Sequence, residues 1–165
     1  MPHEAMKTLL VLRHAHATEV TSFATDADRP LSKRGRSEAM NAARHVARII
    51  PPPTMILSSP ALRAGDTARA IQKALPQADL CLNPDLYGAD PATWLRELQA
   101  LPRDVETALL VGHNPGLELL LAGLTGATPG LSPATLAHLE LAVDEWRDLR
   151  TDGTARQVKL IPPEP

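Results

Sequence analysis

The sequence predicts an α/β protein in which helices cover both faces of a mostly parallel sheet, a three-layer α/β/α sandwich. Apolar runs at 8–12, 55–57 and 107–111 are short and continuous, as is typical of strands buried on both faces. Segments with helical spacing separate these runs, and this alternation favours parallel strands. No stretch of linker composition divides the chain, so residues 1–165 are expected to form one domain.

The first half of the chain is expected to alternate between strand and helix. The expected elements are a strand at 8–12, a polar loop at 15–30, a helix at 39–50, a strand at 55–57 and a helix from 59 to about 75. The prolines at 51–53 end the first helix, because proline lacks a backbone donor and clashes with the preceding turn. Ser59 can cap the second helix, and Pro60 suits its first position.

The second half continues the same alternation and then changes to two consecutive strands. The expected elements are a strand at 79–82, a helix at 91–101, a strand at 107–111, a helix from 114 to about 124, and strands at 136–143 and 157–161. Asn114 and Pro115 repeat the pattern of a capping residue followed by proline. Asp152 and Gly153 predict a turn between the last two strands.

Composition limits the classes of protein to consider. Apolar residues make up 44 % of the chain and aromatic residues 2 %, so we expect a core of Leu, Ala, Val and Ile. The net charge of −2 gives no electrostatic reason to expect nucleic acid or a membrane as partner. Cys81 is the one cysteine, which leaves no intramolecular disulfide and no Cys-based metal site. The apolar run at 9–12 is too short for a signal peptide or a membrane span, and we expect a cytoplasmic protein.

Arginine and histidine follow three of the predicted strands. Arg13 and His14 come directly after the first strand, Arg63 lies in the first turn of the helix after the second, and His113 follows the strand at 107–111. Ligands of open parallel sheets bind at the carboxyl ends of the strands, which meet at one edge. We therefore expect two arginines and two histidines to share one crevice.

This set of side chains suits phosphoryl transfer. Arginine offers planar forks of donors that match phosphate oxygens, and helix N-termini after Ser59 and Asn114 would add backbone N–H groups. A neutral histidine beside the phosphate can attack phosphorus directly, and nearby arginines favour the neutral imidazole. No carboxylate cluster is of the kind that holds a metal, so neither a metal nor another cofactor is expected.

A single Arg-His pair is weak evidence, and the sequence contains a second one. Arg44 and His45 lie inside a predicted helix with no strand before them, which indicates an exposed helix face. Each of the other candidates also has an ordinary structural explanation when it is taken alone. The hypothesis of a phosphoryl-transfer site depends on the joint pattern.

Four segments together resemble the histidine phosphatase superfamily. They are LLVLRHAHA at 9–17, RPLSKRG at 29–35, SSPALRAGDTA at 58–68 and VGHNPG at 111–116. They follow the family's order across roughly residues 8–120. The resemblance implies a phosphoglycerate mutase-like fold, and the short chain is similar to the compact SixA-type phosphohistidine phosphatases.

The resemblance also implies roles for individual residues. His14 matches the nucleophile that becomes transiently phosphorylated, and Arg13 and Arg63 match the residues that hold the phosphoryl group. His113 matches the residue that hydrogen-bonds this group and stabilises the charge of its transition state. Arg29 resembles a further phosphate contact of the compact members.

Two positions depart from the family pattern. Ala15 replaces the more usual glycine after Arg-His. LNPDLYG at 82–88 is similar to the mutase segment that carries the acidic proton donor, but Pro84 stands at the glutamate position. Asp85 is a candidate general acid, as is Asp90, although a loop and a helix start explain these two residues better.

Several functions remain in competition. The first is hydrolysis of protein phosphohistidine, possible partners being histidine-phosphorylated signalling proteins; the second, with the same fold, is hydrolysis of a sugar phosphate or nucleotide. A metal-dependent hydrolase would use His14 and His16, an H-x-H pair after a strand, but an extended segment would point these side chains to opposite faces. A phosphate-binding module without turnover is a further alternative.

Overall fold

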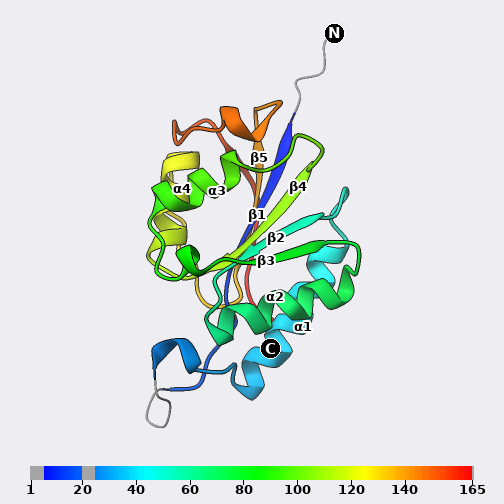
Figure 1. Cartoon of the computed structure of the whole chain (residues 1–165), viewed down its shortest axis with the longest axis vertical. Helices are drawn as coiled ribbons and strands as arrows, with labels where there is room; N and C mark the ends of the chain where they lie inside the picture. Colours follow the sequence, from blue (N-terminus) through cyan, green and yellow to red (C-terminus); the bar gives the residue numbers. More distant parts are fainter. Residues whose placement is uncertain (1–5, 20–24, 165) are drawn as a thin grey trace.

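Helices cover both faces of one sheet in the computed structural model, which describes residues 6–19 and 25–164. Helices α1 (Lys33–Ala47) and α2 (Leu62–Ala74) lie on one face, and α3 (Pro91–Gln99) and α4 (Gly116–Thr125) on the other (Figure 1). The predicted three-layer α/β/α sandwich is thus confirmed.

The sheet is parallel on one side and antiparallel on the other. Its strands are β1 (Lys7–Arg13), β2 (Met55–Ser58), β3 (Asp79–Leu82), β4 (Thr107–Gly112), β5 (Leu136–Leu141) and β6 (Arg156–Ile161), in the order β3-β2-β4-β1-β5-β6. Strands β3, β2, β4 and β1 run parallel, and β5 and β6 are antiparallel to their neighbours. The carboxyl ends of β1, β2 and β4 therefore meet at one edge of the sheet.

Strand β1 shows why its sequence is apolar throughout rather than alternating. Leu9 and Val11 pack in the core on the side of α3 and α4, whereas Leu10 and Leu12 pack on the side of α1 and α2. Successive side chains of a strand point to opposite faces, and here both faces are covered. The core is aliphatic as expected, except that Trp94 and Trp146 are also fully buried.

Helix α1 begins earlier than the sequence pattern predicts. The Ser32 hydroxyl accepts a hydrogen bond from the Gly35 backbone N–H and caps the helix. The first turns expose Lys33, Arg34 and Arg36, so they carry little apolar periodicity from which a helix could be predicted.

Both predicted pairs of capping residue and proline are wrong in detail. Helix α2 begins at Leu62, and the Ser59 hydroxyl accepts instead from the Ala61 N–H just before it. Helix α4 begins at Gly116, and the Asn114 side chain donates to Glu118 and to the Leu131 carbonyl. In both places the polar side chain lies at the carboxyl edge of the sheet and does not accept from a backbone N–H of the helix itself.

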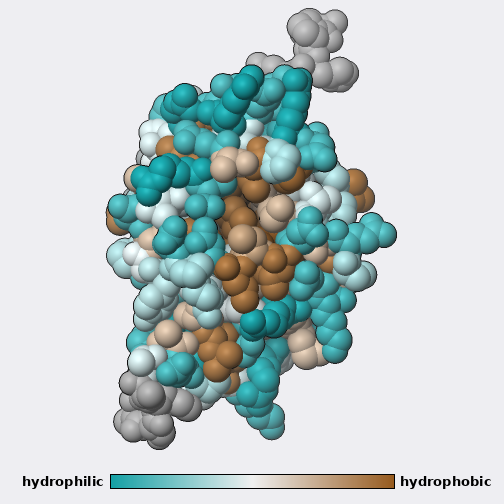
Figure 2. All heavy atoms as spheres, viewed as in Figure 1, coloured by the Kyte–Doolittle hydropathy of each residue, from teal (hydrophilic) through white to brown (hydrophobic). Residues whose placement is uncertain are grey.

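The remaining elements follow the prediction closely. Strands β5 and β6 pair with each other, and the 3₁₀ helix η3 (Trp146–Asp148) lies in the connection between them. Within the described residues, no helix is long and apolar enough to cross a membrane. Hydrophilic side chains predominate on the face seen in Figure 2, apart from a hydrophobic patch near β3.

Candidate functional site

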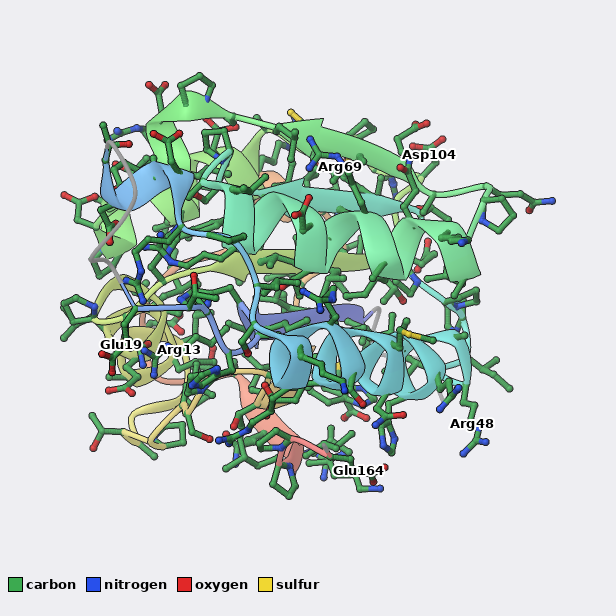
Figure 3. The ribbon with its side chains drawn as sticks, turned by 90° about the horizontal axis from the view of Figure 1, so that it is seen from below. Arg13, Glu19, Arg48, Arg69, Asp104 and Glu164 are labelled. Carbon is green, nitrogen blue, oxygen red and sulfur yellow. The ribbon has the colours of Figure 1, made fainter. Side chains whose placement is uncertain are left out.

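The carboxyl edge of the sheet brings together His14, Arg63 and His113, which lie far apart in the sequence. The imidazole rings of His14 and His113 have centroids 5.1 Å apart, and Arg63 Nη2 lies 3.4 Å from His113 Nδ1. Arg13 ends β1 directly before His14. Figure 3 shows Arg13 and Glu19 at this end of the molecule, with Arg48 and Asp104 toward the opposite end.

The backbone around His14 is fixed by three hydrogen bonds from different elements. The His14 N–H donates to the Gly112 carbonyl at the end of β4 over 3.0 Å. The Ala15 N–H donates to Thr67 Oγ1 in α2 over 3.1 Å, and the His16 N–H donates to Glu38 Oε1 in α1 over 3.0 Å. Backbone N–H groups that would be costly to bury unpaired are thereby satisfied.

The sequence analysis missed Glu38 and Thr67. Glu38 is 1 % exposed, and its carboxylate also pairs with Arg34. Its position on the apolar face of α1 was a signal, because a buried carboxylate in a helix requires a partner. Gly35 belongs to the same contact: a Cβ built there would overlap the carbonyl oxygen of His16, so only glycine lets α1 pack this closely.

The ring of His14 is held in the tautomer that a nucleophile needs. Its Nδ1 lies 2.8 Å from the Ala15 carbonyl oxygen, which can only accept, so Nδ1 carries the proton and Nε2 keeps a free lone pair. The pKa of His14 is lowered to about 3, mainly by burial and also by the neighbouring His113, Arg63 and Arg13, against the opposing effect of the Ala15 hydrogen bond. The imidazole is therefore neutral at physiological pH.

His113 is also neutral, with the opposite tautomer. The Arg63 guanidinium can only donate, so Nδ1 of His113 accepts and Nε2–H donates to Ser59 Oγ over 2.7 Å. Burial and the charge of Arg63 lower the pKa of His113 to about 4. This contact explains why Ser59 does not cap α2.

The two arginines each retain a donor that has no partner among the described residues. Arg13 Nη1 donates to the Leu131 carbonyl over 2.9 Å. The Nε atoms of Arg13 and Arg63 are buried and have no hydrogen-bond partner among residues 6–19 and 25–164. Buried donors of this kind on two cations beside a neutral histidine fit an anion such as a phosphoryl group.

Asp26 is a further residue that the sequence analysis missed. It lies in the 3₁₀ helix η1 (Asp26–Asp28), and its Oδ2 accepts from Arg63 Nη2 over 2.9 Å and from the Tyr87 hydroxyl over 2.6 Å. Its Oδ1 accepts from Arg29 Nη1 over 3.1 Å. The hydrogen bonds from Tyr87, Arg29 and Arg63 hold the pKa of Asp26 well below its usual range. The Tyr87 ring in turn meets that of His113 edge-on, with centroids 5.6 Å apart.

Arg29 and Asp85 were also predicted site residues, but the structure does not place them in the central cluster. That cluster consists of Arg13, His14, Arg63 and His113. Arg29 donates from Nε to the Thr18 carbonyl and from Nη1 to Asp26, so its connection to Arg63 passes through that carboxylate. Asp85 is exposed in the 3₁₀ helix η2 (Pro84–Leu86), where its N–H bonds to Asn83. The other candidate acid, Asp90, caps α3 by accepting from the Thr93 N–H.

The remaining sequence candidates lie outside the cluster. His16 Nδ1 bonds to Ser32 Oγ, while the ring of His14 bonds to Ala15. In the part of the chain that the structure describes, no group of three or more His, Cys, Asp or Glu side chains could hold a metal ion. The pair Arg44 and His45 lies in α1, as expected, where the two side chains bond to Asn41 and Glu164.

A small cavity adjoins His113. It has a volume of about 160 Å³ and is lined by residues 88–91, residues 113–116 and Leu119. Larger cavities of about 590 and 480 Å³ lie between α1 and α2 and around Lys7 and Arg103, but neither includes a residue of the Arg-His cluster. The chemistry of the side chains, rather than cavity size, therefore defines the candidate site.

With this fold and site established, comparison with known proteins gives the family. The chain belongs to the histidine phosphatase superfamily (branch 1), whose family model matches residues 9–94. Within that superfamily it is similar to a compact protein of SixA type: it superposes with a TM-score of 0.85 on the solved structure of a candidate phosphohistidine phosphatase SixA from Nakamurella multipartitia, with 27 % identity, over 96 % of this chain and 97 % of that one.

Two other proteins show the range of the similarity. An uncharacterized chloroplastic protein of Arabidopsis thaliana is 30 % identical over 152 residues, which cover 86 % of this chain and 70 % of the relative. A mycobacterial glucosyl-3-phosphoglycerate phosphatase shares the fold, with a TM-score of 0.71 and 18 % identity over 93 % of this chain and 97 % of that one.

Proposed function

We propose that this protein is a metal-independent phosphatase of the cytoplasm that hydrolyses protein phosphohistidine through a phosphorylated His14. One observation carries the proposal. His14 is neutral, its Nε2 lone pair is free, and it lies beside His113 and two arginines whose buried Nε donors have no partner among the described residues.

The proposed reaction has two displacements at phosphorus. In the first, Nε2 of His14 forms a bond to phosphorus as the bond from phosphorus to the leaving group breaks. In the second, water attacks the phosphorylated His14, and inorganic phosphate leaves as the imidazole regains its lone pair. Arg13 and Arg63 neutralise the charge that develops on the phosphoryl oxygens, the role that a metal has in other phosphatases. A bound dianion also raises the pKa of His113 and allows this ring to donate to the phosphoryl group.

Proton supply favours phosphohistidine as the substrate. A leaving alkoxide is a strong base and needs a proton from the enzyme, whereas an imidazole that solvent has protonated leaves without one. The acidic groups closest to the cluster are poor donors: Asp26 is ionised, and its hydrogen bond raises the pKa of Tyr87. An enzyme with this site would therefore cleave leaving groups of low basicity best.

A comparison of the rates at which different substrates are cleaved tests the proposal. The values of kcat/KM are compared for a phosphohistidine protein, aryl phosphates with leaving groups of graded basicity, and sugar phosphates, all in EDTA. We expect phosphohistidine and activated aryl phosphates to be cleaved far faster than sugar phosphates. A profile that is flat across leaving groups would favour the small-ester phosphatase instead.

Trapping the intermediate tests the nucleophile. Brief incubation with labelled substrate should leave an acid-labile, base-stable phosphoryl group on His14, and His14→Ala should abolish both label and turnover. His45→Ala, a change at the surface of α1, is the matched control and should retain both. Label at another residue would show that the nucleophile is misassigned.

A further inference from the structure

We infer that Asp26 is a positioning residue that fixes the guanidinium of Arg63 in the orientation that phosphate binding requires, an inference that rests on the proposed function. The geometry of the pair carries it. Arg63 Nη1 donates to the Asp26 backbone carbonyl over 2.8 Å, and Nη2 donates to Asp26 Oδ2 over 2.9 Å. One residue thus accepts from both terminal nitrogens of the fork.

This contact leaves the Nε side of the guanidinium open to a ligand. A guanidinium can bind a phosphate through its Nη1–Nη2 end or through its Nε–Nη2 side, and Asp26 occupies the end. The Nε atom of Arg63 is buried and has no partner among the described residues. The second hydrogen of Nη2 is donated to His113 Nδ1 over 3.4 Å. Asp26 therefore leaves the Nε donor of Arg63 available for the phosphoryl group, next to the Nη2 donor that Arg63 shares with His113.

Asp26 can hold Arg63 because it is itself held from two further directions. Arg29 donates to its Oδ1, and the Tyr87 hydroxyl donates to its Oδ2. The side chain of Asp26 is 46 % exposed and that of Arg63 is 7 % exposed. A carboxylate at the surface thus holds a buried guanidinium. Charge-assisted bonds from two arginines are stronger and more directional than neutral ones. This gives Arg29 a second role besides its predicted contact with phosphate: it supports the residue that orients Arg63.

Two other roles for Asp26 fit the geometry less well. As a proton donor it would have to be protonated, yet both of its carboxylate oxygens accept hydrogen bonds from Tyr87, Arg29 and Arg63. As an inhibitory stand-in for phosphate it would have to occupy the free donors of the arginines. Instead, its bonds go to other atoms, and the buried Nε atoms of Arg13 and Arg63 have no partner in the part of the chain that the structure describes.

The test compares Asp26→Ala with Asp28→Ala, a matched change in the same 3₁₀ helix. The Asp28 carboxylate accepts from the Thr25 hydroxyl, and within the described part of the chain Asp28 forms no hydrogen bond or ion pair with Arg63. Vanadate binding is measured by calorimetry, and kcat/KM is measured across aryl phosphates of graded leaving-group basicity. For Asp26→Ala we expect both to fall by ~10- to 100-fold, the scale of a misplaced catalytic group. Asp28→Ala should stay near the unmodified protein.

Two further readouts separate positioning from a structural or an acid role. In an Arg63→Ala background, Asp26→Ala should cause little additional loss, because the residue acts through Arg63. The loss from Asp26→Ala should also be uniform across leaving groups. Asp26→Asn keeps one acceptor oxygen and should recover part of the affinity for vanadate.

Several results would overturn the inference. Vanadate binding that is unchanged or tighter in Asp26→Ala would mean that Asp26 does not present Arg63 or competes with the ligand. Full additivity with Arg63→Ala would point to a general structural role, and a loss that grows with leaving-group basicity would identify a proton donor. If the unmodified protein shows no turnover but binds vanadate, the proposed function fails while the binding comparison still decides the role of Asp26. If it does not bind vanadate either, both proposals fail.

Discussion

Replacing His14 by asparagine should make the stability of the fold less sensitive to acid. The pKa of His14 is lowered from its ordinary 6.5 to about 3, mainly because the ring is buried. Between these two values the unfolded chain binds a proton that the folded chain does not bind. The contribution of the neutral His14 ring to the free energy of unfolding is therefore fully present above pH 6.5 and is lost as the pH falls toward 3.

The size of the effect follows from the shift. At ~1.4 kcal/mol per pKa unit, the full shift corresponds to about 5 kcal/mol, and between pH 7.5 and pH 5 the loss is ~2 kcal/mol. A small domain has only about 5–15 kcal/mol of stability, so this is a measurable share. His14→Asn removes the titrating group and keeps a polar side chain of similar reach.

Urea unfolding at pH 7.5 and pH 5 measures the difference. The free energy of unfolding of the unmodified protein should fall by ~2 kcal/mol more than that of His14→Asn, while the contribution of His113 remains in both. Ile71→Val, a change in the core under α2, should cost ~1 kcal/mol at both pH values and controls for lower stability alone. An equal fall in both proteins would refute the assignment of a buried, neutral His14.

Three other predictions follow from the site. Arg63→Ala and His113→Ala should each lower turnover by ~100-fold or more in steady-state assays, the scale of one transition-state donor, whereas Arg44→Ala and His45→Ala should have little effect; equal losses in the two pairs would contradict the assignment. Activity should survive EDTA and be inhibited by vanadate, and a metal requirement in a chelator titration would count against arginine-based charge neutralisation. Asp85→Asn should barely change kcat/KM for phosphohistidine or activated aryl phosphates, and a large loss with alkyl phosphates alone would identify Asp85 as the acid.

The sequence predicted the layers of the fold well because the strands are buried on both faces. The continuous apolar runs at 8–12 and 107–111 correspond to β1 and β4, and the run at 55–57 corresponds to β2. The beginnings of helices were less predictable. Ser59 and Asn114 have the chemistry of capping residues, but the Ser59 hydroxyl accepts from His113 and the Asn114 amide donates to the Leu131 carbonyl. Local preference was overridden by contacts between distant segments.

The residues of the candidate site likewise differ in how well the sequence predicts their positions. Strand ends have fixed places in a parallel sheet, so the approach of His14, Arg63 and His113 could be predicted from the topology. The carboxylates that organise them could not. Asp26 lies in an irregular segment, where no periodicity gives a position, and Glu38 reaches the backbone of His16 only because α1 packs against it.

The close approach of Gly35 to the His16 carbonyl has a consequence for how this protein can vary. In a saturation library selected for turnover, position 35 should return glycine almost alone, because every larger side chain would press on the carbonyl of His16 and displace the backbone next to His14. Such a map of tolerated substitutions would rank a residue with no side chain beside the arginines proposed to bind phosphate. Intolerance to change around His14 therefore reports helix packing as well as chemistry, and only kinetic measurements on purified variants can separate the two.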